Sequence, residues 1–300
     1  MITSTEILSD KKKPSNFYFY RDQIEQEIAR SISSLGEKTK LRDACEYALT
    51  NGGKRFRPLL VYLIAEALGY GLNVSEAALS VEFFHTASLI VDDLPCMDND
   101  DERRDKPSAH KVYGETIALL ASYALITAAF GKIQRNAELM RAVGAPFAAS
   151  ADRVVTIALE CAAHCSGIMG ATGGQFYDMF PPPFSLENIK QVIYKKTVTL
   201  FEVAFIFGWL FGGGDLAQIQ RVRKTAYHFG MAFQVADDLN DIDQDEKMER
   251  DINLAKFFGK ERAHAVFEEE MRAFDFSLKE LRLDTPSFFK MQQMLRSYVK

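Results

Sequence analysis

Two clusters of aspartates are the residues of this chain best suited to bind a cation. The first lies in residues 92–101, with the sequence DDLPCMDNDD, and the second lies in residues 237–241, with the sequence DDLND. Each cluster follows a strongly apolar stretch, which is residues 77–91 for the first. Carboxylates at the carboxyl end of an apolar helix oppose the helix dipole and repel one another. A divalent cation would compensate both effects.

The spacing of the carboxylates selects the candidate ligands. Asp237 and Asp241 lie four positions apart, and therefore on one face of a helix. Asp98 follows Asp92 by six positions, about 240° around a straight helix, but Pro95 should end that helix so that a loop brings Asp98 back. The predicted metal ligands are Asp92, Asp93, Asp98, Asp237, Asp238 and Asp241. The other acidic residues of the first cluster, Asp100, Asp101 and Glu102, are expected to be solvated.

Paired carboxylate clusters of this kind suit the binding of a diphosphate through several Mg²⁺ ions. Magnesium takes octahedral oxygen ligands, usually one or two carboxylates together with phosphate oxygens and water. Two facing sets of carboxylates could therefore hold one diphosphate between them. Calcium storage is an alternative, but the sequence lacks a twelve-residue loop with ligands at the required offsets. We predict Mg²⁺ as the cofactor, with several ions bridging the diphosphate.

Basic and polar residues surround the clusters in an order that resembles the trans-isoprenyl diphosphate synthase (polyprenyl synthetase) family. The similarity extends from about Leu41 to Asp241 and is greatest to the bacterial and plant types that make geranylgeranyl or farnesyl diphosphate. The two aspartate clusters resemble the family's two aspartate-rich motifs, the first with two extra residues. The other matching segments are GGKRFRP at residues 52–58, His85, Arg103-Arg104, Gly173-Gly174-Gln175, Lys196-Thr197 and Phe233-Gln234.

The resemblance implies roles for these residues. Lys54, Arg57 and His85 would bind isopentenyl diphosphate, and Arg103 and Arg104 would divide between the allylic diphosphate and isopentenyl diphosphate. Lys196, Thr197 and Gln234 would also bind substrate. The residues expected to be catalytic are Asp92, Asp93, Asp98, Arg103, Lys196, Thr197, Gln234 and Asp237. Taken singly, each basic residue is more often a solvated charge, and it is their shared order that favours the site.

The implied reaction is the head-to-tail condensation of isopentenyl diphosphate with dimethylallyl, geranyl or farnesyl diphosphate. Ionisation of the allylic C–O bond produces a cation and a highly charged leaving group. Mg²⁺, Arg103 and Lys196 would stabilise the departing diphosphate. The cation needs a dry pocket with nearby dipoles, for which Thr197 and Gln234 are candidates. The released diphosphate can take the final proton, so no separate base is required.

The residues before Asp92 predict the length of the product. Ser88 and Ala87 lie about one helical turn deeper, roughly 5–6 Å, and both are small. Phe84 and Phe83 lie about two turns deeper, roughly 12 Å, and are expected to form the floor of the cavity. This arrangement predicts a C20 product, geranylgeranyl diphosphate. Farnesyl diphosphate is the alternative product.

Some positions differ from the family pattern. Residues 242–258 are shorter than usual and lack the expected pair of lysines, for which Lys247, Arg250 or Lys256 could substitute. Glu102 and Asp105 replace Leu and Gly beside the paired arginines. A weakly active regulatory subunit of a prenyl synthase therefore stays an alternative, although the intact aspartate clusters argue against it. A terpene cyclase is a third reading, and the second aspartate-rich motif disfavours it.

The periodicity of the apolar residues predicts the elements that position this site. It is helical from Tyr20 to the end, with no convincing alternating strand. Helices are expected at residues 58–68, 75–91, 116–131, 151–169, 186–211 and 216–241. Several of them are apolar nearly all round and should be central, with residues 260–300 packed outside. We predict an all-α fold, a large helical bundle of the isoprenoid synthase type, with a flexible N-terminus (residues 1–16) and one domain (residues 17–300).

Composition narrows the class of protein. The net charge is −5 with no basic stripe, which argues against a nucleic-acid partner. The four cysteines do not suggest a disulfide framework, and Cys161 and Cys165 are expected to be core residues. The longest uncharged run, residues 116–131, is shorter than the ~20 residues of a membrane span, and the N-terminus does not resemble a signal peptide. We expect a cytoplasmic protein without a transmembrane segment, and the resemblance implies a homodimer.

Overall fold

The structure is a computed structural model that describes residues 16–183, 185–240, 242 and 253–299. The predicted flexible segment up to residue 15, the predicted ligand Asp241, and Lys247 and Arg250 lie outside these ranges. The predicted all-α fold is confirmed. The α-helices are α1 (Phe17–Ser31), α2 (Lys40–Leu49), α3 (Phe56–Leu68), α4 (Ser75–Asp92), α5 (Ala109–Tyr113), α6 (Glu115–Val143), α7 (Phe147–Ser166), α8 (Ala171–Met179), α9 (Leu186–Ile193), α10 (Thr199–Phe211), α11 (Ile219–Asn240), α13 (Leu254–Phe258), α14 (Lys260–Glu280) and α15 (Pro286–Tyr298).

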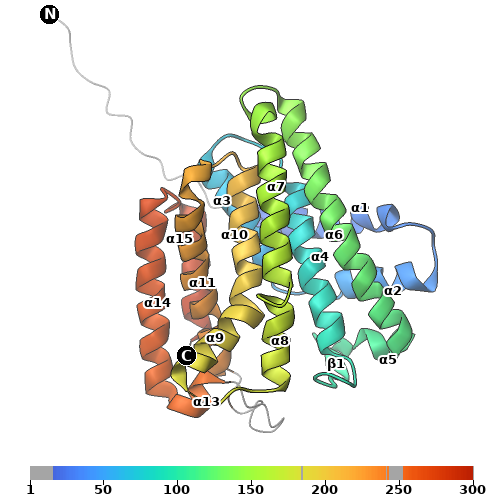
Figure 1. The fold of residues 1–300 in the computed structure, drawn as a ribbon, viewed down its shortest axis with the longest axis vertical. Coiled ribbons are helices and arrows are strands. Elements are labelled where there is room, and N and C mark those ends of the chain that lie inside the picture. Colours follow the sequence, from blue (N-terminus) through green and yellow to red (C-terminus); the bar gives the residue numbers. More distant parts are fainter. Residues whose placement is uncertain (1–15, 184, 241, 243–252, 300) are drawn as a thin grey trace, which may run out of the picture.

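Helix α10 is the centre of the bundle, as its all-round apolar sequence predicts. All thirteen of its residues are buried, and it packs against α3, α4, α7 and α11. Figure 1 shows α14 and α15 on one side of it and α4, α6 and α2 on the other. Helix α14 packs mainly against α11, so the expectation that residues 260–300 lie outside the central helices is confirmed.

Helix α6 differs from its prediction in length and in burial. It has 29 residues and ends at Val143 rather than near residue 131. It continues through Lys132 because the ammonium of this buried residue pairs with Glu76 on α4, with Nζ 2.7 Å from Oε2. One face of α6 packs on α4, whereas the other leaves four large apolar side chains exposed: Leu119, Leu120, Tyr123 and Ile126. The expectation that the apolar helices are central therefore holds for only one face of α6.

With 29 residues, α6 is longer than the ~20 residues of a membrane span, unlike the uncharged run from which it was predicted. Helix α6 and the helical stretch Phe147–Met179 are each long and apolar enough to cross a bilayer by length and composition. In each case 39% of the apolar 18-residue stretch is buried inside the bundle. Core helices of other proteins meet the same criterion, so this observation is weak evidence for a membrane span.

The predicted helix at residues 186–211 is interrupted by a π-helical turn. This turn, η2 (Tyr194–Val198), lies between α9 and α10. The backbone N–H of Thr199 donates to the carbonyl of Tyr194, five residues earlier, so the turn holds one more residue than an α-helical turn. Such turns occur frequently at functional sites. This one contains Lys196 and Thr197.

A short hairpin follows the first aspartate cluster. Strand β1 (Glu102–Arg103) pairs antiparallel with β2 (Lys106–Pro107). The two residues between them, Arg104 and Asp105, both have positive φ, 57° and 61°, as a type I′ turn requires. The turn thus forms although Asp105 stands where a glycine is usual. In Figure 1, β1 lies at the same end of the bundle as α8, α9 and α13.

Candidate active site

Two neighbouring cavities meet at this end of the bundle. The apolar cavity, of about 330 Å³, is enclosed by α4, α6, α8 and η2. The basic cavity, of about 430 Å³, lies between the N-terminus of α3, α4, the hairpin and α11. Turn η2 separates them, because Lys196 lines the apolar cavity and its neighbour Thr197 lines the basic one. Most of the predicted site residues within the described chain line these two spaces.

The first aspartate cluster folds back as Pro95 predicts. Helix α4 ends at Asp92, and the backbone N–H of Asp98 donates to the carbonyl oxygen of Asp92 at 2.9 Å. This contact returns Asp98 to the end of the helix, and Gln175 on α8 holds it there by donating from Nε2 to Oδ1 at 3.1 Å. Asp92 itself lines the apolar cavity. These two carboxylates thus lie together at its mouth.

Asp93 and Asp100 face a different neighbour. Arg103 donates from Nε to Oδ1 of Asp93 at 2.9 Å and from Nη2 to Oδ2 of Asp100 at 3.1 Å. Both aspartates are buried. The expectation that Asp100 is solvated was therefore wrong, because the hairpin brings Arg103 over it, whereas Asp101 and Glu102 are exposed as expected. Asp93 is thus already paired with the guanidinium of Arg103, in addition to any metal ion that it binds.

The surroundings of Asp92 fit the Mg²⁺ that the family resemblance implies. Burial raises the pKa of Asp92 to about 7; Lys196 opposes this rise and Asp98 adds to it. A buried carboxylate beside a second one is a suitable place for a hard cation with oxygen ligands. The carboxylates of Asp92 and Asp98 therefore fit the donor set of a magnesium site.

The second cluster separates into two roles in the structure. Asp237 lines the basic cavity, and its Oδ1 lies 4.0 Å from Nζ of Lys54. Asp238, one position further around α11, is buried and accepts from Nε2 of Gln234 at 2.8 Å and from the backbone N–H of Leu254 at 2.8 Å. Asp238 thus ties α11 to the start of α13, whereas Asp237, the other described aspartate of the cluster, faces the cavity.

The basic cavity brings together the residues expected to bind isopentenyl diphosphate. Arg57 lies with Nη1 3.3 Å from Nε2 of His85 and with its guanidinium 4.2 Å from the ring centroid of Phe201. Lys54, Arg103 and Arg104 line the same space. Burial and the nearby guanidiniums, Arg57 first, lower the pKa of His85 well below its usual value, so this imidazole is neutral at pH 7.

Two neighbouring residues of turn η2, Lys196 and Thr197, line different cavities. Lys196 pairs with Asp178 on α8. Burial would lower the pKa of Lys196, but Asp178, Asp92 and Asp98 raise it, so the ammonium stays charged. The hydroxyl of Thr197 donates to Oε1 of Gln234 at 2.7 Å. The extra residue of the π turn thus lets adjacent residues serve different cavities.

Asp178 on α8 is a part of the site that the sequence did not predict. Helix α8 approaches η2 closely: a Cβ at position 174 would lie 2.2 Å from the backbone nitrogen of Lys196, so only glycine fits there. Gln175 and Asp178 lie three positions apart on one face of α8, each bonded to a predicted site residue. The spacing Gly-Gly-Gln-x-x-Asp was visible in the sequence and could have indicated this face.

The proposed chain-length residues divide between the cavity and the core. Phe84, Ala87 and Ser88 line the apolar cavity, with Ser122 and Ile126 of α6 opposite. The ring of Phe84 packs edge-on against Phe130, with centroids 5.1 Å apart. Phe83 is fully buried but is not among the lining residues, and its ring lies 5.7 Å from Nζ of Lys132. The exposed rings of Phe176 and Phe180 form the cavity's outer rim.

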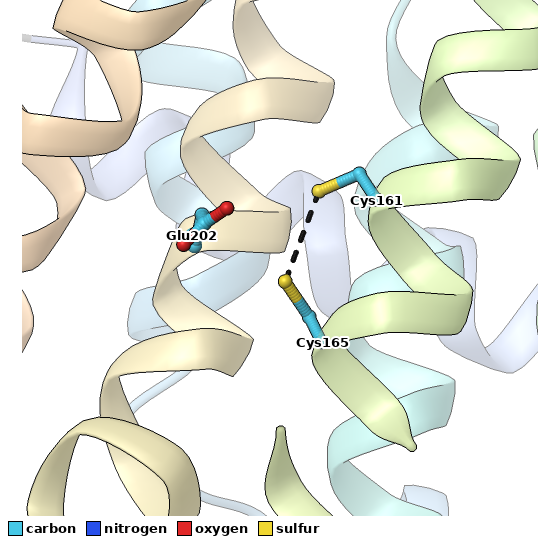
Figure 2. A group of neighbouring side chains, drawn as sticks. All are labelled: Cys161, Cys165 and Glu202. Carbon is cyan, nitrogen blue, oxygen red and sulfur yellow. Dashed lines mark hydrogen bonds between the residues drawn. The ribbon is translucent and has the colours of Figure 1, made fainter. Parts of the chain in front are cut away.

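A separate cluster of potential metal ligands lies between α7 and α10. Figure 2 shows Cys161 and Cys165 on one helix with Glu202 opposite them. The two sulfurs are 3.9 Å apart, and the three ligand atoms lie within 4.8 Å of one another. However, Oε1 of Glu202 already pairs with Arg223 at 2.7 Å, and burial raises the pKa of the carboxyl. The arrangement fits the expectation that Cys161 and Cys165 are core residues. The buried carboxylate beside them already has Arg223 as its partner.

Comparison with known proteins agrees with this geometry. A family model described as polyprenyl synthetase matches residues 38–257. A protein of Arabidopsis thaliana named putative geranylgeranyl pyrophosphate synthase 8, chloroplastic, is 36% identical over 258 residues, which cover 81% of this chain and 69% of that protein. A second protein of this plant, heterodimeric geranylgeranyl pyrophosphate synthase large subunit 2, is 37% identical over 261 residues, 83% of this chain and 65% of that one.

A solved structure is similar over nearly the whole chain. The FPP/GFPP synthase from Zymomonas mobilis has a TM-score of 0.78 and 28% sequence identity, covering 95% of this chain and 99% of that one. Our chain spans about two thirds of the length of the two plant relatives. The family match, the fold and the arrangement of the site agree, and the chain belongs to the polyprenyl synthetase family of prenyltransferases.

Proposed function

We propose that this chain is a geranylgeranyl diphosphate synthase that condenses isopentenyl diphosphate with dimethylallyl, geranyl and farnesyl diphosphate. The observation that carries this proposal is the wall of the apolar cavity below Asp92. Ala87 and Ser88 leave room for the growing chain, and Phe84 lies one turn deeper. The names of the plant relatives support a C20 product. The name of the Zymomonas mobilis enzyme keeps farnesyl diphosphate as the alternative.

The basic cavity would hold isopentenyl diphosphate. Lys54, Arg57 and Arg104 supply positive charge around a space that His85 lines in its neutral form. Arg57 and Arg104 present planar guanidiniums, which suit two-pronged contacts to phosphate oxygens. The carbon chain of this substrate would point past Thr197 toward the apolar cavity.

The allylic diphosphate would lie at the mouth of the apolar cavity. Asp92 and Asp98, with Asp237 from the other side, would hold Mg²⁺, which when bound supplies charge compensation for the leaving diphosphate. Lys196, kept charged by Asp178, would donate to the same leaving group. The hydroxyl of Thr197 and the amide of Gln234 would direct their dipoles toward the developing allylic cation. Asp93 and Asp238 would support these groups through Arg103 and Gln234.

A second copy of the chain is the partner that we propose. Large apolar side chains are exposed on α6, and others are exposed on α7 and in the residues before α8, namely Leu159, Ile168 and Met169. Exposed apolar side chains that gather in one surface patch are typical of a protein–protein interface. Equilibrium sedimentation should give a dimer, and Leu120→Asp should give monomers. Heterodimerisation with a related subunit is the alternative, because one relative is named as a heterodimeric large subunit.

The test of the proposed activity is elongation of each allylic primer with isopentenyl diphosphate and Mg²⁺, followed by chromatography of the products. We expect C20 alcohol after dephosphorylation, and no product when EDTA replaces Mg²⁺. Asp98→Asn should lower kcat at least about 100-fold, whereas Asp101→Asn, an exposed neighbour, should have no effect. A wild-type enzyme that elongates no primer would favour a regulatory subunit, and a hydrocarbon product would favour a terpene cyclase.

The cellular location is a separate expectation. The composition led us to expect a cytoplasmic protein, and the first plant relative is named chloroplastic. Fractionation of the source cells with an antibody against the chain would decide between the cytoplasm and an organelle.

A further inference from the structure

A buried ion pair lies beneath the loop that carries Lys54 and Arg57. Arg55 has a side chain with no exposed surface, and it pairs with Glu82 on α4, which is 1% exposed. The same guanidinium donates from Nε to Oε1 of Glu25 on α1 at 2.8 Å and from Nη2 to the carbonyl of Leu49 at the end of α2 at 2.6 Å. One side chain thus connects three helices to the start of α3.

The backbone at Arg55 is in an unfavourable conformation. Its φ of 52° and ψ of 30° lie in the left-handed region, which residues other than glycine avoid. Such conformations persist where the surrounding contacts determine them, and they cluster at functional sites. Here the contacts of the buried guanidinium supply that restraint. The outcome is that the guanidinium of Arg55 contacts α1, α2 and α4 at the edge of the basic cavity, which Lys54 and Arg57 line on either side of it.

Glu82 also balances the charge of the basic cavity. It lies three positions before His85 on the same face of α4, and both residues line the cavity. Burial lowers the pKa of Arg57 to about 10, and the carboxylate of Glu82 opposes this shift. Burial likewise lowers the pKa of Arg104, and Glu82 is the first group that opposes it. Three guanidiniums, those of Arg55, Arg57 and Arg104, are thus gathered around one buried carboxylate.

We propose that the Arg55–Glu82 pair positions the pocket for isopentenyl diphosphate: it holds residues 53–57 so that Lys54 and Arg57 converge on one diphosphate. The inference rests on the proposed function, since it assigns that substrate to the basic cavity. Neither Arg55 nor Glu82 needs to react. Their effect is on the binding of one substrate, so the allylic diphosphate at the mouth of the apolar cavity should not sense it.

The test compares single variants of the pair with a matched control. Arg55→Gln and Glu82→Gln each leave a buried charge without its main partner. We expect the KM for isopentenyl diphosphate to rise about 10-fold to 100-fold, the range seen when supporting residues around a ligand group are removed. The KM for farnesyl diphosphate should stay within about twofold, in keeping with the independence of sites without shared partners. Lys132→Met breaks the other buried pair on α4, with Glu76, and should destabilise the fold without changing either KM.

A double variant separates positioning from stability. Replacing a whole buried ion pair by apolar residues of similar size is often neutral for stability. Arg55→Met with Glu82→Leu should therefore recover a melting temperature close to that of the wild type, while the KM for isopentenyl diphosphate stays high. If the double variant restores both the melting temperature and the KM for isopentenyl diphosphate, the pair is merely structural and the inference is overturned. The same conclusion follows if Lys132→Met raises this KM as much as Arg55→Gln does.

Direct binding keeps this test separate from that of the proposed function. Calorimetry with inorganic diphosphate in EDTA probes the basic cavity, because without Mg²⁺ the aspartates repel the anion. If the wild type elongates no primer but binds diphosphate, the proposed function fails and the inference is still decided by Arg55→Gln. Binding weakened at least about tenfold in that variant supports the inference. Equal binding in the two proteins, or no binding to the wild type, overturns it.

Discussion

Phe83 and Phe84 are adjacent phenylalanines on α4, but only Phe84 lines the apolar cavity. Truncation of each ring therefore gives a matched pair of variants. Phe84→Ala removes the ring that packs against Phe130 at the deep end of the cavity. Phe83→Ala removes a fully buried ring on the side of Lys132. We expect the first change to lengthen the product beyond C20, and the second to leave its length unchanged.

The size of this effect follows from the helix geometry. Phe84 lies eight positions before Asp92, a distance of about 12 Å along the axis. Three covalent bonds of an extended chain span about 3.8 Å, so the four main-chain bonds of an isoprenyl unit span about 5 Å. Removing the ring therefore opens room for about one more unit. The added isoprenyl unit has five carbons, and burying them stabilises the longer chain by up to about 4 kcal/mol at ~0.8 kcal/mol per carbon. This is enough to make C25 a major product.

Both variants should lose comparable stability, which makes product length the informative measurement. Truncation of a buried Phe to Ala costs about 3–5 kcal/mol, and urea denaturation would measure that cost. Products from farnesyl diphosphate and isopentenyl diphosphate would be separated by reverse-phase chromatography after dephosphorylation. If Phe83→Ala lengthens the product as much as Phe84→Ala, or if Phe84→Ala still stops at C20, the assignment of Phe84 as the floor is refuted.

Further predictions concern four other positions. Ala87→Tyr should shorten the main product to C15, because the new ring enters the cavity one turn below Asp92; an unchanged product length would contradict the tunnel argument. Asp105→Gly should raise the free energy of unfolding by about 0.5–1 kcal/mol by relieving the positive φ, as measured by urea denaturation. The folded-state pKa of His85 is depressed, so the unfolded chain takes up a proton that the folded one refuses, and stability falls as the pH drops below the ordinary value of 6.5. His85→Gln should therefore flatten the stability profile between pH 6.5 and 5, by at most about 1.4 kcal/mol per pH unit. Asp178→Asn should lower kcat about 10-fold to 100-fold through Lys196, and single-turnover kinetics that show no change would refute this role.

The sequence predicted those parts of the fold and site that depend on local rules. Helical periodicity identified the all-α bundle, and Pro95 predicted the return of Asp98 to the end of α4. The family could be identified from the sequence alone, because several of its motifs occur in the expected order. All of these inferences use either neighbouring residues along the chain or a pattern shared with relatives.

The contacts that the sequence did not predict join segments through tertiary packing. Arg103 reaches Asp93 because a two-residue hairpin reverses the chain between α4 and α5. The uncharged run at residues 116–131 underestimates the length of α6, because Lys132 is buried in an ion pair with Glu76 and the helix continues past it. Periodicity of 3.6 residues cannot reveal a π turn either, since one added residue only shifts the pattern by about 100°.

The π turn has a consequence for how this chain can change in length. A deletion inside an α-helix normally rotates everything beyond it by about 100° and misaligns the packed faces. Between Tyr194 and Val198 the helix already contains one residue in excess, so a deletion there would restore a continuous α-helix with α9 and α10 in their present alignment. The protein should then fold but lose the divergence of Lys196 and Thr197. A one-residue deletion at this place should thus abolish activity without abolishing the fold. A folded, inactive relative could therefore arise in a single genetic event.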